Sequence, residues 1–352
     1  MSIALDLGSD LLRSLRVQGD RLLARRCRAT CSILPDNPAQ RRLLEQSRIP
    51  FATCEDSLVL IGSAAVELAQ VFGVPRQEIL PGGIVPPQDP VARQLIAVLT
   101  EALLGPAQER YEVCSLVQPA HILHAQDERQ DSLQFFQRLL RLQGYIPCPI
   151  SAGRALAYAT LGQDAMTGIV LALGRSGTEV AVVYRGQSVV ERSLPRGTRW
   201  LDQQLAEQFH LLQHDPAGQA WLDIDQATRF RERSEQALVA PSTDDEKTLR
   251  KLASDWISNL VSELEPILVK AASELRLKQP LPLICGGGLA QWPGLVERLT
   301  ERLRKQEIAP LIGEVRRTPA AAYTICRGAL IHAELEAASL HQARAVQQAS
   351  AA

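Results

Sequence analysis

Hydrophobic and polar positions follow two different patterns along the chain. Apolar runs at residues 2–7, 11–18 and 21–33 are separated by glycine-containing turns, and this spacing predicts three β-strands. Further strands are predicted at residues 58–61, 113–117, 145–150, 167–173 and 281–285. Between several of these runs, apolar residues return every three or four positions, which is typical of amphipathic helices. The alternation of strands and helices favours a layered α/β fold.

The pattern restarts halfway along the chain. Each half opens with a short strand, a glycine turn and further strands, and then passes into helices. In the second half, Thr243 and Glu246 form a capping box that opens a long amphipathic helix. The chain has 352 residues, more than a single hydrophobic core usually serves. We therefore expect two lobes, the first from residues 1–163 plus 318–352 and the second from residues 164–317.

Composition excludes several classes of function. Lys and Arg number 38 and Asp and Glu 39, so the formal net charge of −1 gives no field that attracts nucleic acid or an anionic membrane. No apolar stretch approaches the length of a membrane span, and the start of the chain is strand-like rather than a signal peptide. The seven cysteines form no CxxC pair, which disfavours a disulfide framework or a zinc knuckle. A cytoplasmic location is expected.

Three short apolar strands each run directly into a glycine turn. The turns are Asp6-Leu7-Gly8-Ser9, Gly174-Arg175-Ser176-Gly177-Thr178 and Gly286-Gly287-Gly288. Glycine allows backbone N–H groups to approach an anion closely. One such turn is common in proteins, but three of them in this order are much more specific.

At these turns the sequence resembles the actin-like ATPase superfamily, which includes the bacterial actin MreB, the nucleotide-binding domain of DnaK-type chaperones and the sugar kinases. Residues 6–9 match the first phosphate loop of that family, DLGT, and residues 172–182 match the second, DIGGGTTEVAV. Residues 286–288 match the adenosine loop, and residues 326–330 match the ARGAL-like run of the closing helix. The match extends from Ile3 to about Ala333, without the chaperones' peptide-binding domain. It implies a two-lobed, duplicated ribonuclease-H-like fold with a central nucleotide cleft.

The resemblance also implies a set of nucleotide contacts. A cleft of this kind binds ATP or ADP, with magnesium held beside Asp6. The residues implied to contact the nucleotide are Asp6, Gly8, Ser9, Gly174, Arg175, Gly177, Thr178, Glu232, Gly286, Gly287 and Gly288. Two of these have a plainer alternative, since Asp6 taken alone can cap a turn and Arg175 can simply face solvent.

Of the catalytic acids that the resemblance implies, only Asp6 is retained. The aspartate of the second phosphate loop is replaced by Ala172, the glutamate of the connecting helix by Ile150, and the chaperones' catalytic lysine by Val66. Loss of one acid commonly costs a factor of about 10² or more in rate, so we assign no catalytic residue and expect little turnover. Nucleotide binding is expected to be weak or lost. Where it survives, Arg175 is expected to lower its dependence on magnesium.

These observations predict a pseudo-ATPase rather than an enzyme. The leading interpretation is a non-hydrolysing scaffold or regulatory module that acts through another protein or through self-association. The alternative is a slow ATPase of the MreB or DnaK type, and a third possibility is a filament-forming cytoskeletal protein whose assembly does not need hydrolysis.

Overall fold

Two five-stranded sheets with the same strand order form the centre of the molecule. The computed structural model describes all residues except 1, 126–128, 215–217, 277–278, 320–321 and 352. The first sheet has the order β3 (Arg21–Arg28), β2 (Leu11–Gln18), β1 (Ser2–Leu7), β8 (Val113–Gln118) and β9 (Ile146–Ser151). The second has the order β12 (Gln187–Leu194), β11 (Thr178–Tyr184), β10 (Gly168–Leu173), β15 (Leu281–Gly286) and β16 (Ile312–Arg317).

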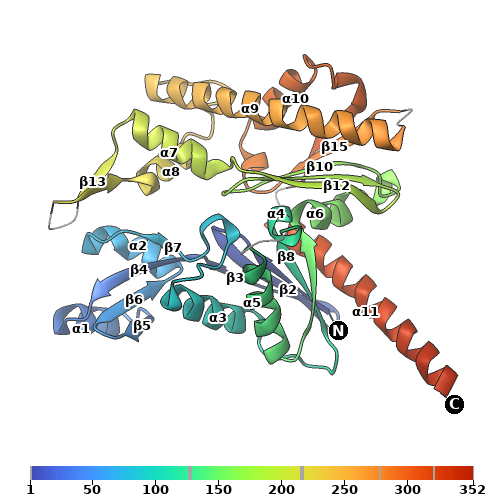
Figure 1. Cartoon of the computed structure of the whole chain (residues 1–352). Coiled ribbons are helices and arrows are strands. Elements are labelled where there is room, and N and C mark those ends of the chain that lie inside the picture. Colours follow the sequence, from blue (N-terminus) through green and yellow to red (C-terminus); the bar gives the residue numbers. More distant parts are fainter. Residues whose placement is uncertain (1, 126–128, 215–217, 277–278, 320–321, 352) are drawn as a thin grey trace.

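Each sheet joins an antiparallel meander to a parallel pair. β1 is antiparallel to β2 and parallel to β8, and β10 is likewise antiparallel to β11 and parallel to β15. The predicted duplication and the two-lobed fold are therefore confirmed, and Figure 1 shows one sheet above the other. We call the parts of the molecule built around them the first and second lobe. The division at residues 163 and 317 stays a proposal.

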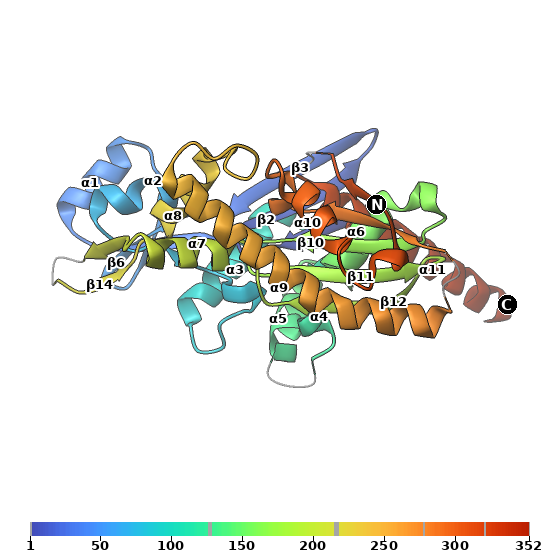
Figure 2. The same cartoon turned by 90° about the horizontal axis from the view of Figure 1, so that it is seen from above.

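Helices cover the outer face of each sheet, and two more lie on the inner side. In the first lobe the outer helices are α3 (Pro90–Leu104) and α5 (Arg129–Leu142). In the second lobe they are α7 (Thr198–Gln208), α9 (Asp244–Leu275) and α10 (Leu295–Leu303). Seen from above, α9 runs across the second lobe (Figure 2). Its N-cap Thr243 accepts a hydrogen bond from the backbone N–H of Glu246 at 3.1 Å, as the sequence predicts.

The inner helices, α6 (Ala152–Thr160) and α11 (Thr324–Ala351), pack directly on each other and on the sheets. Gly328 of α11 makes this contact possible, because a Cβ atom there would lie only 1.6 Å from the carbonyl oxygen of Ala155. The last turns of α11 extend away from the body of the molecule (Figure 1). Gly328 therefore fixes the closing helix against the middle of the structure.

A smaller sheet lies beside the first one, with the order β5 (Phe51–Cys54), β6 (Ser57–Ile61), β4 (Thr30–Pro35) and β7 (Gln77–Glu78). The single strand predicted for residues 21–33 is wrong, because it divides at Ala29 into β3 and β4, which belong to different sheets. The Ala29 N–H donates to Asp10 and its carbonyl accepts from Ile79, so the chain leaves the first sheet there.

The remaining elements are short. They are α1 (Pro38–Gln46), α2 (Ser63–Phe72), α4 (Ala120–Leu123), α8 (Ile224–Arg233), the hairpin β13 (Leu212–His214) and β14 (Ala220–Leu222), and single 3₁₀ turns at Pro81–Gly83, Gly162–Asp164, Leu289–Gln291 and Ala309–Leu311. Within the described ranges, no helix has the length and apolar character needed to cross a membrane.

Candidate functional site

The three glycine turns meet at one cavity between the lobes. The cavity has a volume of about 1310 Å³ and extends from the first phosphate turn to Pro293, which follows the 3₁₀ turn at Leu289–Gln291. Of the residues implied by the family resemblance, those that line it are Asp6, Gly8, Ser9, Gly174, Arg175, Gly177, Glu232, Gly287 and Gly288. Thr178 and Gly286 are buried behind this surface. The Thr178 hydroxyl is 3.5 Å from the carbonyl oxygen of Arg196.

Backbone packing sets the shape of the turns. Gly287 has a φ of +90°, and a Cβ atom there would lie 2.4 Å from the carbonyl oxygen of Leu173. This position requires glycine both for its conformation and for the close approach. The adenosine turn is thereby held against the end of β10, next to the second phosphate turn.

In the first lobe, the retained acid Asp6 already has a cationic partner. Asp6 lies directly opposite Arg13 in the β1–β2 pairing, and the Arg13 Nη1 is 3.2 Å from the Asp6 Oδ2. Burial raises the pKa of Asp6 above its ordinary value, although the Arg13 guanidinium opposes that shift. Both side chains line the cavity.

The second lobe has its acid on the other strand of the equivalent hairpin. Ala172, where the resemblance implies an aspartate, lies opposite Glu179 in the β10–β11 pairing. Glu179 lines the cavity and accepts a hydrogen bond from the Ala120 N–H of the first lobe at 2.8 Å, and another from the Ser193 hydroxyl. Desolvation raises the pKa of Glu179 to about 7. Glu179 thus joins the lobes instead of standing free beside a ligand.

Further polar contacts cross the cleft between the lobes. Glu78 of β7 accepts from the Arg175 Nε at 3.3 Å and from Arg199. The Arg175 Nη1 also lies 3.4 Å from Asp202 within the second lobe. Arg175 is therefore mostly buried and paired with two carboxylates, and its contact with a phosphate stays a prediction.

Two more side-chain contacts connect the lobes. Arg76 pairs with Asp225 at the start of α8. Ser9 and Ser176, from the first and second phosphate turns, are hydrogen-bonded to each other. Arg76, Ser9 and Ser176 thus have partners on the opposite side of the cleft.

Comparison with known proteins identifies the family. A family model described as Volactin matches residues 1–333. The chain belongs to the Volactin family. A search of curated proteins finds no match.

Solved structures establish the fold of this Volactin-family chain. A double helical filament of MamK matches with a TM-score of 0.66 and 15% identity, covering 95% of this chain and 99% of MamK. MreB 5 of Spiroplasma citri bound to AMPPNP matches with a TM-score of 0.67 and 12% identity over 97% and 98% of the two chains. The ethanolamine utilization protein EutJ from Carboxydothermus hydrogenoformans matches with a TM-score of 0.51 and 15% identity over 94% and 89%. The predicted actin-like fold is confirmed.

The residues of this Volactin-family cleft do not fit a magnesium ion well. Magnesium is usually held through one or two carboxylates and several waters. Asp6 is paired with a guanidinium, Ala172 offers no ligand, and Glu179 is occupied by two hydrogen bonds. Across the described part of the chain, no group of three or more His, Cys, Asp or Glu side chains is placed to hold a metal.

Sequence reasoning did not identify Arg13, Arg76 or Glu179 as residues of the cleft, although all three line it. A local signal existed for two of them. Arg13 and Glu179 follow their glycine turns on the returning strand of a hairpin, so counting residues back from the turn pairs them with Asp6 and Ala172. Arg76 lies in an irregular connection, and nothing in the local pattern distinguishes it.

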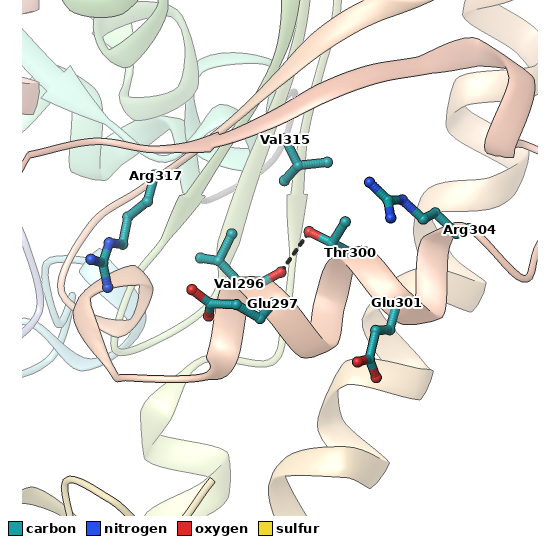
Figure 3. A pocket seen from close by; sticks show the side chains of 7 residues that line it. All are labelled: Val296, Glu297, Thr300, Glu301, Arg304, Val315 and Arg317. Carbon is teal, nitrogen blue, oxygen red and sulfur yellow. Dashed lines mark hydrogen bonds between the residues drawn. The ribbon is translucent and has the colours of Figure 1, made fainter. Parts of the chain in front are cut away.

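A second, smaller hollow lies between α10 and β16, away from the glycine turns. Its volume is about 520 Å³. The Thr300 hydroxyl in its centre donates to the carbonyl of Val296 at 2.7 Å (Figure 3). The charged side chains around it, including Glu297 and Arg304, point in different directions (Figure 3). The interlobe cavity is therefore the stronger candidate.

Proposed function

We propose that this chain is a non-hydrolysing actin-like module that holds ATP or ADP in its cleft and acts by binding another protein or further copies of itself. The observation that carries the proposal is the state of the two equivalent hairpins at the cleft. One retains an acid that a guanidinium neutralises, and the other has lost its acid at Ala172.

The lost acids argue against hydrolysis. Phosphoryl transfer to water needs a group that orients the water and cations that neutralise the phosphates. Ile150 and Ala172 place hydrocarbon where the family has acids, and both are buried. Glu179 is the nearest substitute in the second lobe, but its oxygens already accept hydrogen bonds from Ala120 and Ser193.

The retained framework supports a nucleotide as ligand. The cavity, at about 1310 Å³, is large enough for a nucleoside triphosphate, and glycine turns present backbone N–H groups along it. MreB 5, which shares the fold, was solved with AMPPNP. MamK, which also shares it, was solved as a double helical filament, and this supports self-association as the mode of action. We place the protein in the cytoplasm.

Sedimentation combined with phosphate release tests this proposal. The purified chain is incubated with and without magnesium and ATP, and both the pelleted fraction and the free phosphate are measured. We expect assembly or partner capture that does not require hydrolysis, and phosphate release at the background rate. Assembly that follows ATP turnover and reverses as ATP is consumed would instead support a dynamic ATPase.

A slow ATPase remains the second candidate, because Asp6 and Glu179 are carboxylates that line the same cavity from opposite lobes. This alternative requires Glu179 to exchange its contact with Ala120 for one with water. Measurable turnover that is lost in both Asp6→Asn and Glu179→Gln would establish it.

A further inference from the structure

We infer that the cation beside the phosphate turns of this cleft is the Arg13 guanidinium rather than a divalent metal, so that the phosphate chain of a nucleoside polyphosphate binds here without magnesium. The inference rests on the proposed nucleotide site and concerns how that site neutralises its ligand. On this inference Asp6 positions the Arg13 guanidinium instead of a magnesium ion.

Geometry places Arg13 where a metal would be needed. Asp6 lies at the end of β1, two residues before Gly8, and Arg13 is its direct partner on β2. The two side chains are joined by one contact of 3.2 Å and line the cavity together with Ser9 and Ser176. A guanidinium at this point supplies a fixed positive charge and directional donors, which suit phosphate oxygens.

Arg13 also keeps unused hydrogen-bonding capacity. Its Nε–H is buried and has no hydrogen-bond partner among the described residues. A buried donor without an acceptor is unfavourable, so an oxygen brought in beside it would be stabilised. With one carboxylate contact for five N–H donors, Arg13 has donors left for a ligand.

Two other arginines of the cleft are more fully engaged by the protein. Arg28 contacts both carboxylate oxygens of Asp10, at 3.1 and 3.2 Å. Arg175 is shared between Glu78 and Asp202. Of these three arginines, Arg13 has the clearest combination of position and spare donors.

Magnesium fits poorly at the same point. An ion bound by Asp6 would share that carboxylate with the Arg13 guanidinium, and the two cations would repel each other. The second lobe offers no compensating ligand at Ala172. The chain thus replaces a metal that must be recruited with a cation that is part of the fold.

Calorimetric titration with ATP tests the inference. The natural protein is titrated in EDTA and in magnesium, and the variants are Arg13→Gln, Arg13→Lys and Asp6→Asn. The control is Arg26→Gln, because Arg26 is the exposed neighbour of Arg13 on β3. We expect the natural protein and the control to bind ATP equally well in EDTA and in magnesium. Arg13→Gln should weaken binding roughly tenfold or more, with Arg13→Lys in between.

The Asp6→Asn variant distinguishes most sharply between phosphate binding by Arg13 and phosphate binding by magnesium. Removing the carboxylate frees the guanidinium and relieves repulsion with the phosphates, so binding in EDTA should be retained or tightened. Binding that needs magnesium and is lost in Asp6→Asn would overturn the inference while leaving the nucleotide site standing. If neither ATP nor inorganic tripolyphosphate binds any of these proteins, the proposed nucleotide site fails, and the inference fails with it. Thermal unfolding curves identify any variant that does not fold, in which case Asp6→Asn and Arg13→Lys decide the question.

Discussion

The two hairpins that face each other across the cleft share their backbone and differ in their charges. In the first lobe, Asp6 stands two residues before the glycine of its turn and pairs with Arg13. In the second lobe, Ala172 stands at the same place and pairs with Glu179. In the first lobe the acid precedes the turn and is neutralised by an arginine, whereas in the second lobe the acid stands only on the partner strand.

This difference shows that the backbone of an actin-like cleft can stay the same while its charged side chains change. Turns such as Gly287 are fixed by contacts with neighbouring backbone, so their positions survive when side chains change. The charged side chains are instead held by the individual groups that they contact. Arg13 neutralises Asp6, and Glu179 accepts from the Ala120 N–H of the opposite lobe. On the proposed function, the duplicated fold keeps its cleft while the reaction is lost.

Substitutions in the backbone framework should lower the free energy of unfolding more than substitutions of the charged groups. Gly328→Val places side-chain atoms where the Ala155 carbonyl already lies, so the closing helix cannot dock. We expect a loss of more than about 3 kcal/mol in the free energy of unfolding, measured by chemical denaturation. Ala338→Val is the matched control, because Ala338 is exposed on the same helix, and it should change stability by about 0.5 kcal/mol or less. Equal stability of the two variants would show that the close contact at Gly328 does not fix the closing helix.

The ion pairs across the cleft should have a moderate effect. Glu78→Gln removes the charge that holds both Arg175 and Arg199, while Arg175 keeps Asp202. We expect a loss of about 1 to 2 kcal/mol in the free energy of unfolding, and a larger radius of gyration by X-ray scattering as the lobes separate.

An exposed acid on α2 provides the reference for that experiment. Glu67→Gln removes an exposed charge from the same lobe, outside the ion pairs of Arg175. If Glu78→Gln scatters like Glu67→Gln, the ion pairs do not hold the cleft closed.

The third expected effect is a pH dependence from Glu179. Its pKa in the folded state is raised to about 7 from 4.5, mainly by burial, with Glu191 adding to the shift. The folded state therefore binds more protons than the unfolded state between these two values, so stability falls as the pH rises from about 4.5 to 7. Glu179→Gln should remove most of this loss at pH 8.

Melting temperatures of the natural protein and Glu179→Gln, recorded at pH 5.5 and pH 8, check this expectation. The variant should have the flatter profile, since glutamine does not ionise. Its carbonyl oxygen can still accept from the Ala120 N–H, and its amide group can donate to the Ser193 hydroxyl. Parallel profiles would show that Glu179 remains ionised and that its contact with Ala120 does not depend on protonation.

Local signals in the sequence predicted much of this structure. Apolar runs that end in glycine identified β1, β10 and β15, since both strand periodicity and turn chemistry are encoded within a few residues. The division at Ala29 was missed because it depends on hydrogen bonds to Asp10 and Ile79, which tertiary structure brings to it.

The cleft was predictable in outline and not in its contacts. The glycine turns indicated where it lies, and the missing acids were visible at Ala172 and Ile150. The pairing of Glu78 with Arg175 joins residues 97 positions apart, and no local pattern specifies such a contact. Arg13 is predictable from the hairpin register, because counting back from the turn at Gly8 places it opposite Asp6.

The most direct test of the account is a single-turnover hydrolysis experiment with the natural protein. Excess protein is mixed with a trace of labelled ATP and magnesium, and a hydrolysing actin-like protein such as an active MreB is measured in parallel. The account predicts that ATP is recovered intact, with a rate at least about 10²-fold below the active protein. Hydrolysis at a comparable rate, abolished by Asp6→Asn, would contradict the central claim that this cleft has kept its framework and lost its reaction.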